Sequence, residues 1–189
     1  MQKPVKITGI GGSTDSNSYS LNVLKYAVKE ISALGADTFI IDIKDIKLPI
    51  FRYSRGKYKI PEGIKKTLDI IHNSHGLILS SPEYHGTVSS AFKNVIDHLE
   101  GLSAYKPPYL TGKPVGCIAV GGGDNSGSFT LITMVNIVHS LRGIAASGSI
   151  AIPNIKRAFN NEHELTDKNY KRRLKRLASE VFFLASKLS

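Results

Sequence analysis

The chain is poor in cysteine. Only one of its 189 residues is a cysteine, Cys117, and it lies within the apolar run VGCIAV. A single thiol cannot form an internal disulfide, so a reducing cytoplasm is the expected location. A lone cysteine can serve as a nucleophile, but apolar neighbours on both sides predict a small buried hydrophobic residue instead.

The chain also lacks any long hydrophobic segment. No apolar run approaches the roughly 20 residues that a membrane-spanning helix requires. The first ten residues, MQKPVKITGI, contain no apolar core of the kind found in signal peptides. We therefore expect neither a membrane span nor a cleaved leader.

Acidic residues are the minority among the charged side chains. There are 25 Lys and Arg residues against 15 Asp and Glu residues, which gives a formal net charge of +10. A basic surface favours anionic partners such as nucleic acid, anionic lipid or phosphorylated small molecules. Much of the charge lies in residues 167–189, where leucines at helical spacing predict an amphipathic helix with a solvated basic side.

Strand-like and helix-like segments alternate five times along the chain. The apolar runs predict strands over residues 5–12, 37–43, 76–84, 113–123 and 144–154. Helical periodicity predicts helices over residues 19–35, 62–75, 87–102, 128–143 and 167–189, with an irregular connection over 48–61. This alternation predicts an α/β fold, a three-layer sandwich with a five-stranded parallel sheet between helices. The length favours the doubly wound strand order 2-1-3-4-5 in one domain covering residues 1–189.

The loop after the first strand, GIGGSTDSNSYSLN, is rich in glycines and hydroxyl groups. Ligands of such sheets bind beyond the carboxyl ends of the strands, and the start of a helix offers free N–H groups and a partial positive charge. Together with the serine hydroxyls, these features predict a phosphate site. Plain capping of the helix by Asn17 or Ser18 explains the same residues about equally well.

Known nucleotide motifs do not fit this loop. Thr14 stands where the third glycine of G-x-G-x-x-G is required, and Gly112-Lys113 is followed by Pro114, which excludes a P-loop. No G-x-S-x-G sequence occurs, which argues against an α/β-hydrolase. A loop that holds one phosphate through hydroxyls and amides suits a mononucleotide such as FMN.

Two further loops of binding character follow the third and fourth strands. In SSPEYHG, Pro82 fixes its own φ and Gly86 relaxes the chain, so Tyr84 and His85 are expected at the carboxyl edge of the sheet. The fourth strand ends in GGGDNSGS, which leaves room for a planar ligand against bare backbone. In the order 2-1-3-4-5 the strands before these three loops are neighbours, so one ligand can touch all three.

These stretches carry a resemblance. GSTDSNSYS, SPEYHGTVSSAFKNVID and AVGGG resemble the motifs of the NADPH-dependent FMN reductase family, which has a flavodoxin-like fold, and the middle motif is the specific one. The resemblance implies a flavodoxin-like FMN-binding domain that is a homodimer or homotetramer. It implies contacts to the FMN phosphate from Ser13, Asp15, Asn17, Ser18, Tyr19 and Ser20, to the isoalloxazine ring from Pro82, Glu83, Tyr84, His85 and Gly86, and to its flank from Gly121, Gly122, Gly123 and Asp124.

Two departures from the family pattern affect the site. Asp15 stands where many relatives have arginine, and a carboxylate beside a phosphate is unfavourable by about 1 kcal/mol or more. Asp15 must therefore point away, cap an amide or weaken phosphate affinity, and the choice between NADH and NADPH stays open. His85 replaces the usual asparagine; it is a candidate proton donor near the ring, although a hydrogen-bonding spacer is the favoured interpretation.

The resemblance implies hydride transfer from NADPH or NADH to bound FMN, and then electron transfer to a quinone, azo, nitro, metal or flavin acceptor. No catalytic side chain is required for this chemistry. The alternative is a non-catalytic flavodoxin-like module that carries electrons or binds a partner. Carriers of that kind are usually acidic, so the basic charge favours the enzyme.

Two other signals carry weaker alternatives. His72 and His75 are spaced for a helical metal pair, but no cysteine or carboxylate accompanies them, so no metal site is expected. Residues 51–59 interleave Arg52, Arg55, Lys57 and Lys59 with aromatics, as single-stranded nucleic-acid platforms do. A surface loop is favoured there, a contact to the nicotinamide cofactor comes second, and nucleic acid is a distant third.

Overall fold

A parallel β-sheet forms the centre of the computed structural model, which describes residues 4–46, 48–54 and 58–189. Its main strands are β1 (Lys6–Gly11), β2 (Asp37–Asp42), β3 (Gly76–Tyr84) and β5 (Pro114–Val120), and they pair in the order β2-β1-β3-β5. Two short strands, β6 and β7, follow at the edge beyond β5. The predicted α/β class and strand order are confirmed, and the tips of β1, β3 and β5 are neighbours.

The fifth predicted strand, residues 144–154, is wrong as one continuous element. The structure has β6 (Ile144–Ala145) and β7 (Ile150–Ile152), both parallel to β5, with a turn between them. The Ser149 hydroxyl accepts a hydrogen bond from the Cys117 amide at 3.0 Å, so a side chain takes the place of a backbone carbonyl as the partner of β5 here. The Glu180 carboxylate accepts the amides of Ser147 at 2.7 Å and Gly148 at 2.8 Å, which fixes the turn.

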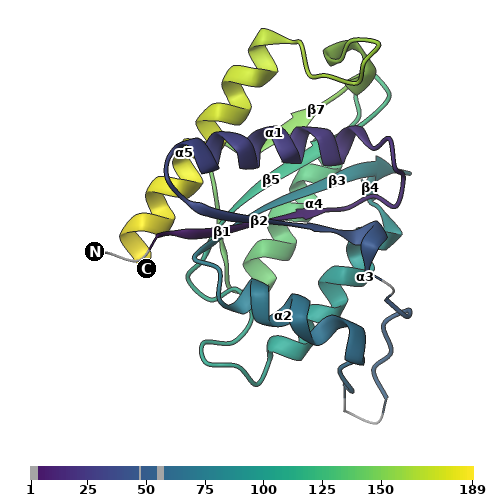
Figure 1. The fold of residues 1–189 in the computed structure, drawn as a ribbon. Helices are drawn as coiled ribbons and strands as arrows, with labels where there is room; N and C mark the ends of the chain where they lie inside the picture. Colours follow the sequence, from purple (N-terminus) through teal and green to yellow (C-terminus); the bar gives the residue numbers. More distant parts are fainter. Residues whose placement is uncertain (1–3, 47, 55–57) are drawn as a thin grey trace.

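Helices cover both faces of the sheet, as Figure 1 shows. Helices α1 (Tyr19–Ala33) and α5 (Lys168–Leu188) pack on one face, and α2 (Lys65–His72), α3 (Ser90–His98) and α4 (Ser128–Ser140) pack on the other. The strands alternate between the two cores, because successive side chains of a strand point to opposite faces. Ile78 and Ile118 therefore join the α1–α5 core, whereas Leu79 joins the other.

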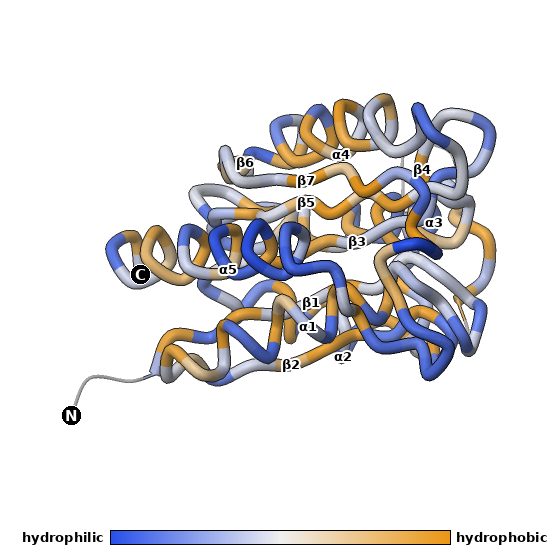
Figure 2. Tube along the Cα trace, turned by 90° about the horizontal axis from the view of Figure 1, so that it is seen from above, coloured by the Kyte–Doolittle hydropathy of each residue, from blue (hydrophilic) through white to orange (hydrophobic). Residues whose placement is uncertain are grey.

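The distribution of hydropathy follows these layers. Figure 2 shows hydrophobic residues along β5 and β7 inside the molecule and a hydrophilic first half of α5. The apolar face of α5 is fully buried at Leu174, Leu177 and Val181, which confirms the amphipathic helix predicted there. No helix within the described ranges is long and apolar enough to cross a membrane.

The predicted helix over residues 87–102 begins too early. Thr87–Val88 form a short strand, β4, which pairs antiparallel with the end of β3. Helix α3 starts only after Ser89, whose hydroxyl accepts the Phe92 amide at 3.0 Å as the N-cap. The segment Leu99–Leu102 then continues as a 3-10 helix.

Gly12 joins three elements where β1 ends. Its amide donates to the Ser80 carbonyl of β3 at 2.7 Å, and its carbonyl accepts from the Ser89 hydroxyl before α3. A Cβ atom at position 12 would lie 2.6 Å from the Ser80 carbonyl oxygen and 3.0 Å from the Phe92 Cβ. The first loop can therefore lie against β3 and α3 only because residue 12 has no side chain.

We predict that Gly12→Ala destabilises the protein, because the added methyl group meets backbone that cannot move aside. The expected loss in the free energy of unfolding is about 1–3 kcal/mol, measured by urea denaturation. Gly122→Ala is the matched control, since a Cβ there meets open space and the expected change is within about 0.5 kcal/mol. Equal stability of the two variants would contradict this account of the junction.

Candidate functional site

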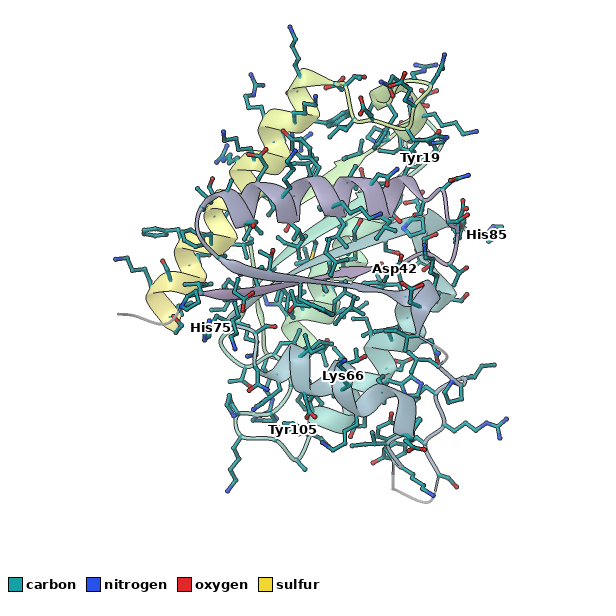
Figure 3. All side chains as sticks on the ribbon, viewed as in Figure 1. Tyr19, Asp42, Lys66, His75, His85 and Tyr105 are labelled. Atoms are coloured by element: carbon teal, nitrogen blue, oxygen red, sulfur yellow. The ribbon has the colours of Figure 1, made fainter. Side chains whose placement is uncertain are left out.

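A hollow of about 150 Å³ lies where the loops after β1, β3 and β5 meet. Figure 3 shows Tyr19 and His85 at this end of the sheet, whereas His75 lies at the opposite end. The following residues line the hollow: Ser13, Asp15, Ser18, Tyr19, Ser20, Pro82, Glu83, Tyr84, Val120, Gly121, Gly122 and Ile155. Three segments that are distant in sequence thus share one site.

The hydroxyl groups at the start of α1 form a connected set. Ser18 is the N-cap of α1 and accepts the Leu21 amide at 3.3 Å, and its hydroxyl lies 2.7 Å from that of Ser20. The backbone carbonyl of Ser20 accepts the Ser80 hydroxyl of β3 at 2.8 Å, which ties this turn to the sheet. Because two paired hydroxyls use only one proton between them, one O–H remains for a ligand.

The backbone at the start of α1 also has free hydrogen-bond donors. The amides of Tyr19 and Ser20 are the first two of α1, so they have no acceptor inside the helix. Within the described part of the chain, no other acceptor takes them. The helix dipole adds a partial positive charge at the same place. This donor set suits a phosphate or another compact anion.

Asp15 caps an amide, which was one of the three alternatives for this residue. Its carboxylate accepts the Asn17 amide at 3.0 Å, and its own amide donates to the Ser13 hydroxyl at 3.2 Å. The Ser13 oxygen therefore acts as an acceptor toward Asp15 and keeps its O–H free for another partner. Asp15 is exposed and also lines the hollow, so its negative charge lies at the rim of the anion site.

The ring of Tyr19 is used for packing. It meets Phe159 edge-on with 5.0 Å between ring centroids and lies 5.4 Å from the ring of His163. The segment around Phe159 follows β7, and Phe159 forms an isolated bridge with Leu165. Tyr19 thus attaches this segment to α1, and it offers its backbone amide to the hollow.

Glu83 has a structural role that the sequence did not reveal. Its carboxylate accepts the Gly127 amide at 2.7 Å and the Thr130 hydroxyl at 2.9 Å, at the start of α4. A negative charge at a helix N-terminus is favourable because of the helix dipole. Glu83 therefore links the end of β3 to α4, and its carboxylate is occupied by these contacts.

His85 and Gly86 form the two-residue turn between β3 and β4. Both have positive φ, 52° and 80°, and the flanking residues Tyr84 and Thr87 are paired across the hairpin. Positive φ at both central positions defines a type I′ turn, in which Asn-Gly is the commonest sequence. Histidine is among the few residues besides glycine that tolerate this conformation. The backbone alone thus explains why this position accepts His or Asn.

The glycine turn after β5 is held by short-range bonds. The Ser126 hydroxyl bonds to both the amide and the carbonyl of Gly123, at 3.0 and 2.7 Å, and a Cβ at Gly121 would collide with it. The Asp124 carboxylate accepts the Asn154 side-chain amide. Gly122 is exposed and has open space where a side chain would begin. It therefore lines the hollow with bare backbone.

Most of the predicted phosphate and ring residues come together, but some do not line the hollow. Of the described residues, Asn17, His85, Gly86, Gly123 and Asp124 lie outside its lining. Two lining residues were missed. Val120 is the last residue of β5, and Ile155 follows β7, in a 3-10 helix that begins after Asn154. Ile155 offered no signal, because its loop follows the strand that the sequence predicted incorrectly.

The single thiol is buried, as the sequence predicts, and each ring of the histidine pair contacts another residue. Burial of Cys117 within β5 raises its pKa to about 12, so the thiol stays protonated. His75 Nδ1 accepts the Lys6 amide at 2.9 Å, and the ring of His72 packs on Tyr105. Burial, together with the nearby Lys113 and Lys6, lowers the pKa of His75. The described ranges contain no cluster of three residues suited to a metal ion.

The segment before α2 that contains Phe51 and Tyr58 packs against α3. The ring of Phe51 lies 5.1 Å from Tyr58 and 5.6 Å from His98, and the Phe51 amide donates to Asn94 at 2.8 Å. Phe51 is tilted against Tyr58 and edge-on to His98, so these aromatic side chains pack on one another. Arg55 and Lys57, which the nucleic-acid alternative invoked, lie outside the described residues.

Size alone does not single out the hollow. A larger one, of about 360 Å³, lies at the amino end of β1 and β2, where Lys6 and Asp37 line it together with residues of α2. The Thr8 and Ser74 hydroxyls there are paired, because the Ser74 hydroxyl donates to the Ile70 carbonyl at 2.8 Å and leaves Thr8 to donate to Ser74 at 2.7 Å. The smaller hollow differs because residues with unpaired amides and free hydroxyls line it at a helix N-terminus.

Comparison with known proteins gives a consistent result. The family model "NADPH-dependent FMN reductase" matches residues 5–157. An FMN-dependent NADPH-azoreductase of Staphylococcus aureus (strain USA300) is 29% identical over 175 residues, which cover 90% of this chain and 89% of that protein. The protein of the same name from Staphylococcus haemolyticus is 32% identical over 145 residues, covering 75% and 73%.

Solved structures share the fold at low identity. A flavoenzyme NAD(P)H:(acceptor) oxidoreductase from Paracoccus denitrificans superposes with a TM-score of 0.77 at 18% identity, covering 97% of this chain and 98% of that one. An NADH:FMN oxidoreductase gives 0.73 at 19% identity, with 98% and 90% covered. A flavodoxin from Archaea gives 0.66 at 12% identity, with 96% and 99% covered.

We predict that position 85 requires a residue that tolerates positive φ. His85→Val places a β-branched residue at positive φ and should lower the free energy of unfolding by about 1–2 kcal/mol in urea denaturation. His85→Asn should leave stability unchanged or slightly higher, because asparagine favours the type I′ turn. If valine and asparagine are tolerated equally, the turn does not constrain this position.

Proposed function

Because the chain belongs to the NADPH-dependent FMN reductase family, it is an FMN-dependent oxidoreductase that uses a reduced nicotinamide, and we propose that it passes the electrons to a small aromatic acceptor of the azo or quinone class. Its curated relatives at 29–32% identity bear the name azoreductase, which supports the azo acceptor. Quinones share the flat conjugated shape and the two-electron reduction. We also propose a single domain and a cytoplasmic location, which the buried thiol favours.

The residues present fit an FMN phosphate. The hydroxyls of Ser13, Ser18 and Ser20 and the amides of Tyr19 and Ser20 would hold it at the N-terminus of α1. The hollow of 150 Å³ is smaller than a typical ligand pocket of about 300 Å³ or more, so it suits the phosphate end of the molecule. The remainder of the cofactor would lie outside it, over the edge of the sheet.

The neighbouring loops suit the flat ring of the cofactor. Tyr84 is 56% exposed beside Pro82, and Gly122 offers bare backbone opposite them. Bound flavin supplies the hydride-accepting ring, and the protein orients it and restricts water. Free amides in these turns would stabilise negative charge on a ligand at this edge. No side chain is required as an acid or base.

One observation carries this proposal. One hollow is lined by the first loop with its unpaired donors, by the end of β3 and by the glycine turn after β5. The chain that forms it matches the FMN reductase family. An electron carrier of the flavodoxin type would share the fold, but the family match and the basic charge of +10 favour the enzyme.

We predict that the purified protein absorbs visible light as a flavoprotein, or takes up added FMN to do so. Anaerobic mixing with NADPH or NADH should then bleach the flavin within the dead time of a rapid-mixing instrument. Adding an azo dye or a quinone should restore the flavin absorbance as the acceptor is reduced. Slow bleaching by both nucleotides at full flavin occupancy would indicate a carrier, and a colourless protein that does not bind FMN would refute the proposal.

We propose further that the protein is a homodimer, one of the two states, homodimer or homotetramer, that the family resemblance implied. Helix α4 exposes Phe129 (70%) and Ile132 (58%), and the loop before α2 exposes Ile50 (80%). A groove of about 460 Å³ between this loop, α3 and α4 adds Ile137 to the same side. A second copy would cover these apolar side chains beside the cofactor site.

We predict a dimer in light scattering coupled to gel filtration, and that Ile132→Glu converts it to a monomer by placing a charge in an apolar contact. Leu34→Glu is the matched control: Leu34 is also an exposed apolar residue, but it follows α1 on the other face of the sheet. A monomeric parent protein, or a dimer that tolerates Ile132→Glu as well as it tolerates the control, would contradict this interface.

A further inference from the structure

Asp15 is an unusual residue to find in a site for an anion. Asp15 lines the hollow proposed for the phosphate, and its carboxylate accepts the amide of Asn17 in the same loop. We propose that Asp15 weakens FMN binding through its charge and makes the affinity strongly dependent on ionic strength, so that FMN exchanges with solution. This inference rests on the proposed function of the site.

The first step is the arrangement of donors and charge in the loop. The hollow offers the free hydroxyl of Ser13, one hydroxyl of the Ser18–Ser20 pair and the first amides of α1. Asp15 lines the same hollow, and its carboxylate is fixed in the loop by the Asn17 amide, which donates to it at 3.0 Å from outside the lining. The loop thus carries its own anion beside these donors before a phosphate arrives.

The second step is direct repulsion. Asp15 is exposed and no ion pair among the described residues neutralises it. A phosphate in the hollow would therefore meet a full negative charge at the rim. A like charge at this range weakens binding by about tenfold at low salt, and the effect declines as salt shortens the screening length.

The substitution Asp15→Asn tests the charge independently of the turn. The asparagine side chain keeps a carbonyl oxygen that can accept the Asn17 amide, so the loop conformation is preserved while the charge is removed. Asp37→Asn is the matched control, because Asp37 is also an exposed aspartate but begins β2, at the opposite end of the sheet. Thermal unfolding of both variants checks that each is folded.

The experiment titrates apoprotein with FMN and with riboflavin, which has the same ring but no phosphate, and follows the quenching of flavin fluorescence. Asp15→Asn should bind FMN about tenfold more tightly than the parent at low salt. The gain should shrink toward onefold at high salt, and riboflavin affinity should be unchanged. Asp37→Asn should bind both flavins as the parent does.

The possible results separate the inference from its premise. Equal or weaker FMN binding by Asp15→Asn overturns the inference, and so does an equal gain for riboflavin, because the charge would then not act on the phosphate. If neither flavin binds the parent or any variant, the proposed function itself fails. An FMN-specific, salt-sensitive gain supports both.

Discussion

The junction at Gly12 is the constraint on which the site depends. The backbone of residue 12 donates to β3 and accepts from the residue that caps α3, and a Cβ there would come within 2.6 Å of the Ser80 carbonyl oxygen. Because residue 12 has no side chain, the first loop can lie against the end of β3, and these two hydrogen bonds hold it there. The serine hydroxyls that follow are thereby placed beside Pro82 and the glycine turn, within reach of one ligand.

The charged and aromatic side chains of this region already make structural contacts. The Glu83 carboxylate caps α4, Asp124 bonds to Asn154, and the Tyr19 ring packs on Phe159. What remains for a ligand is mainly backbone N–H groups and serine hydroxyls, which bind anions and polar edges but catalyse little by themselves. Such a site is suited to a cofactor that brings its own reactivity, since the protein need only position it.

The sequence predicted what depends on local pattern. The bounds of β3 were predicted without error, because the apolar run Leu77–Leu79 and the turn residues His85-Gly86 are both visible in the sequence. Prediction from the sequence failed where tertiary contacts decide the local structure. The division of the last strand into β6 and β7 depends on the Ser149 hydroxyl and on Glu180, which lies 33 positions beyond its partner Ser147. The cap that Glu83 forms on α4 spans 44 positions and has no local signature. Thr87–Val88 follow helical periodicity, yet pairing across the His85-Gly86 turn makes them a strand.

The positive net charge and Asp15 act over different distances. A charge of +10 attracts anionic nucleotides from solution and raises their rate of association, an effect that reaches beyond the site itself. A single carboxylate at the rim of the hollow acts most strongly on a ligand already in place, so on our proposal it would mainly raise the rate of dissociation. A protein with both features would fill and empty its site quickly. Fast exchange of this kind suits a flavin that is delivered and released, whereas a permanent prosthetic group would be better served by a neutral residue at position 15.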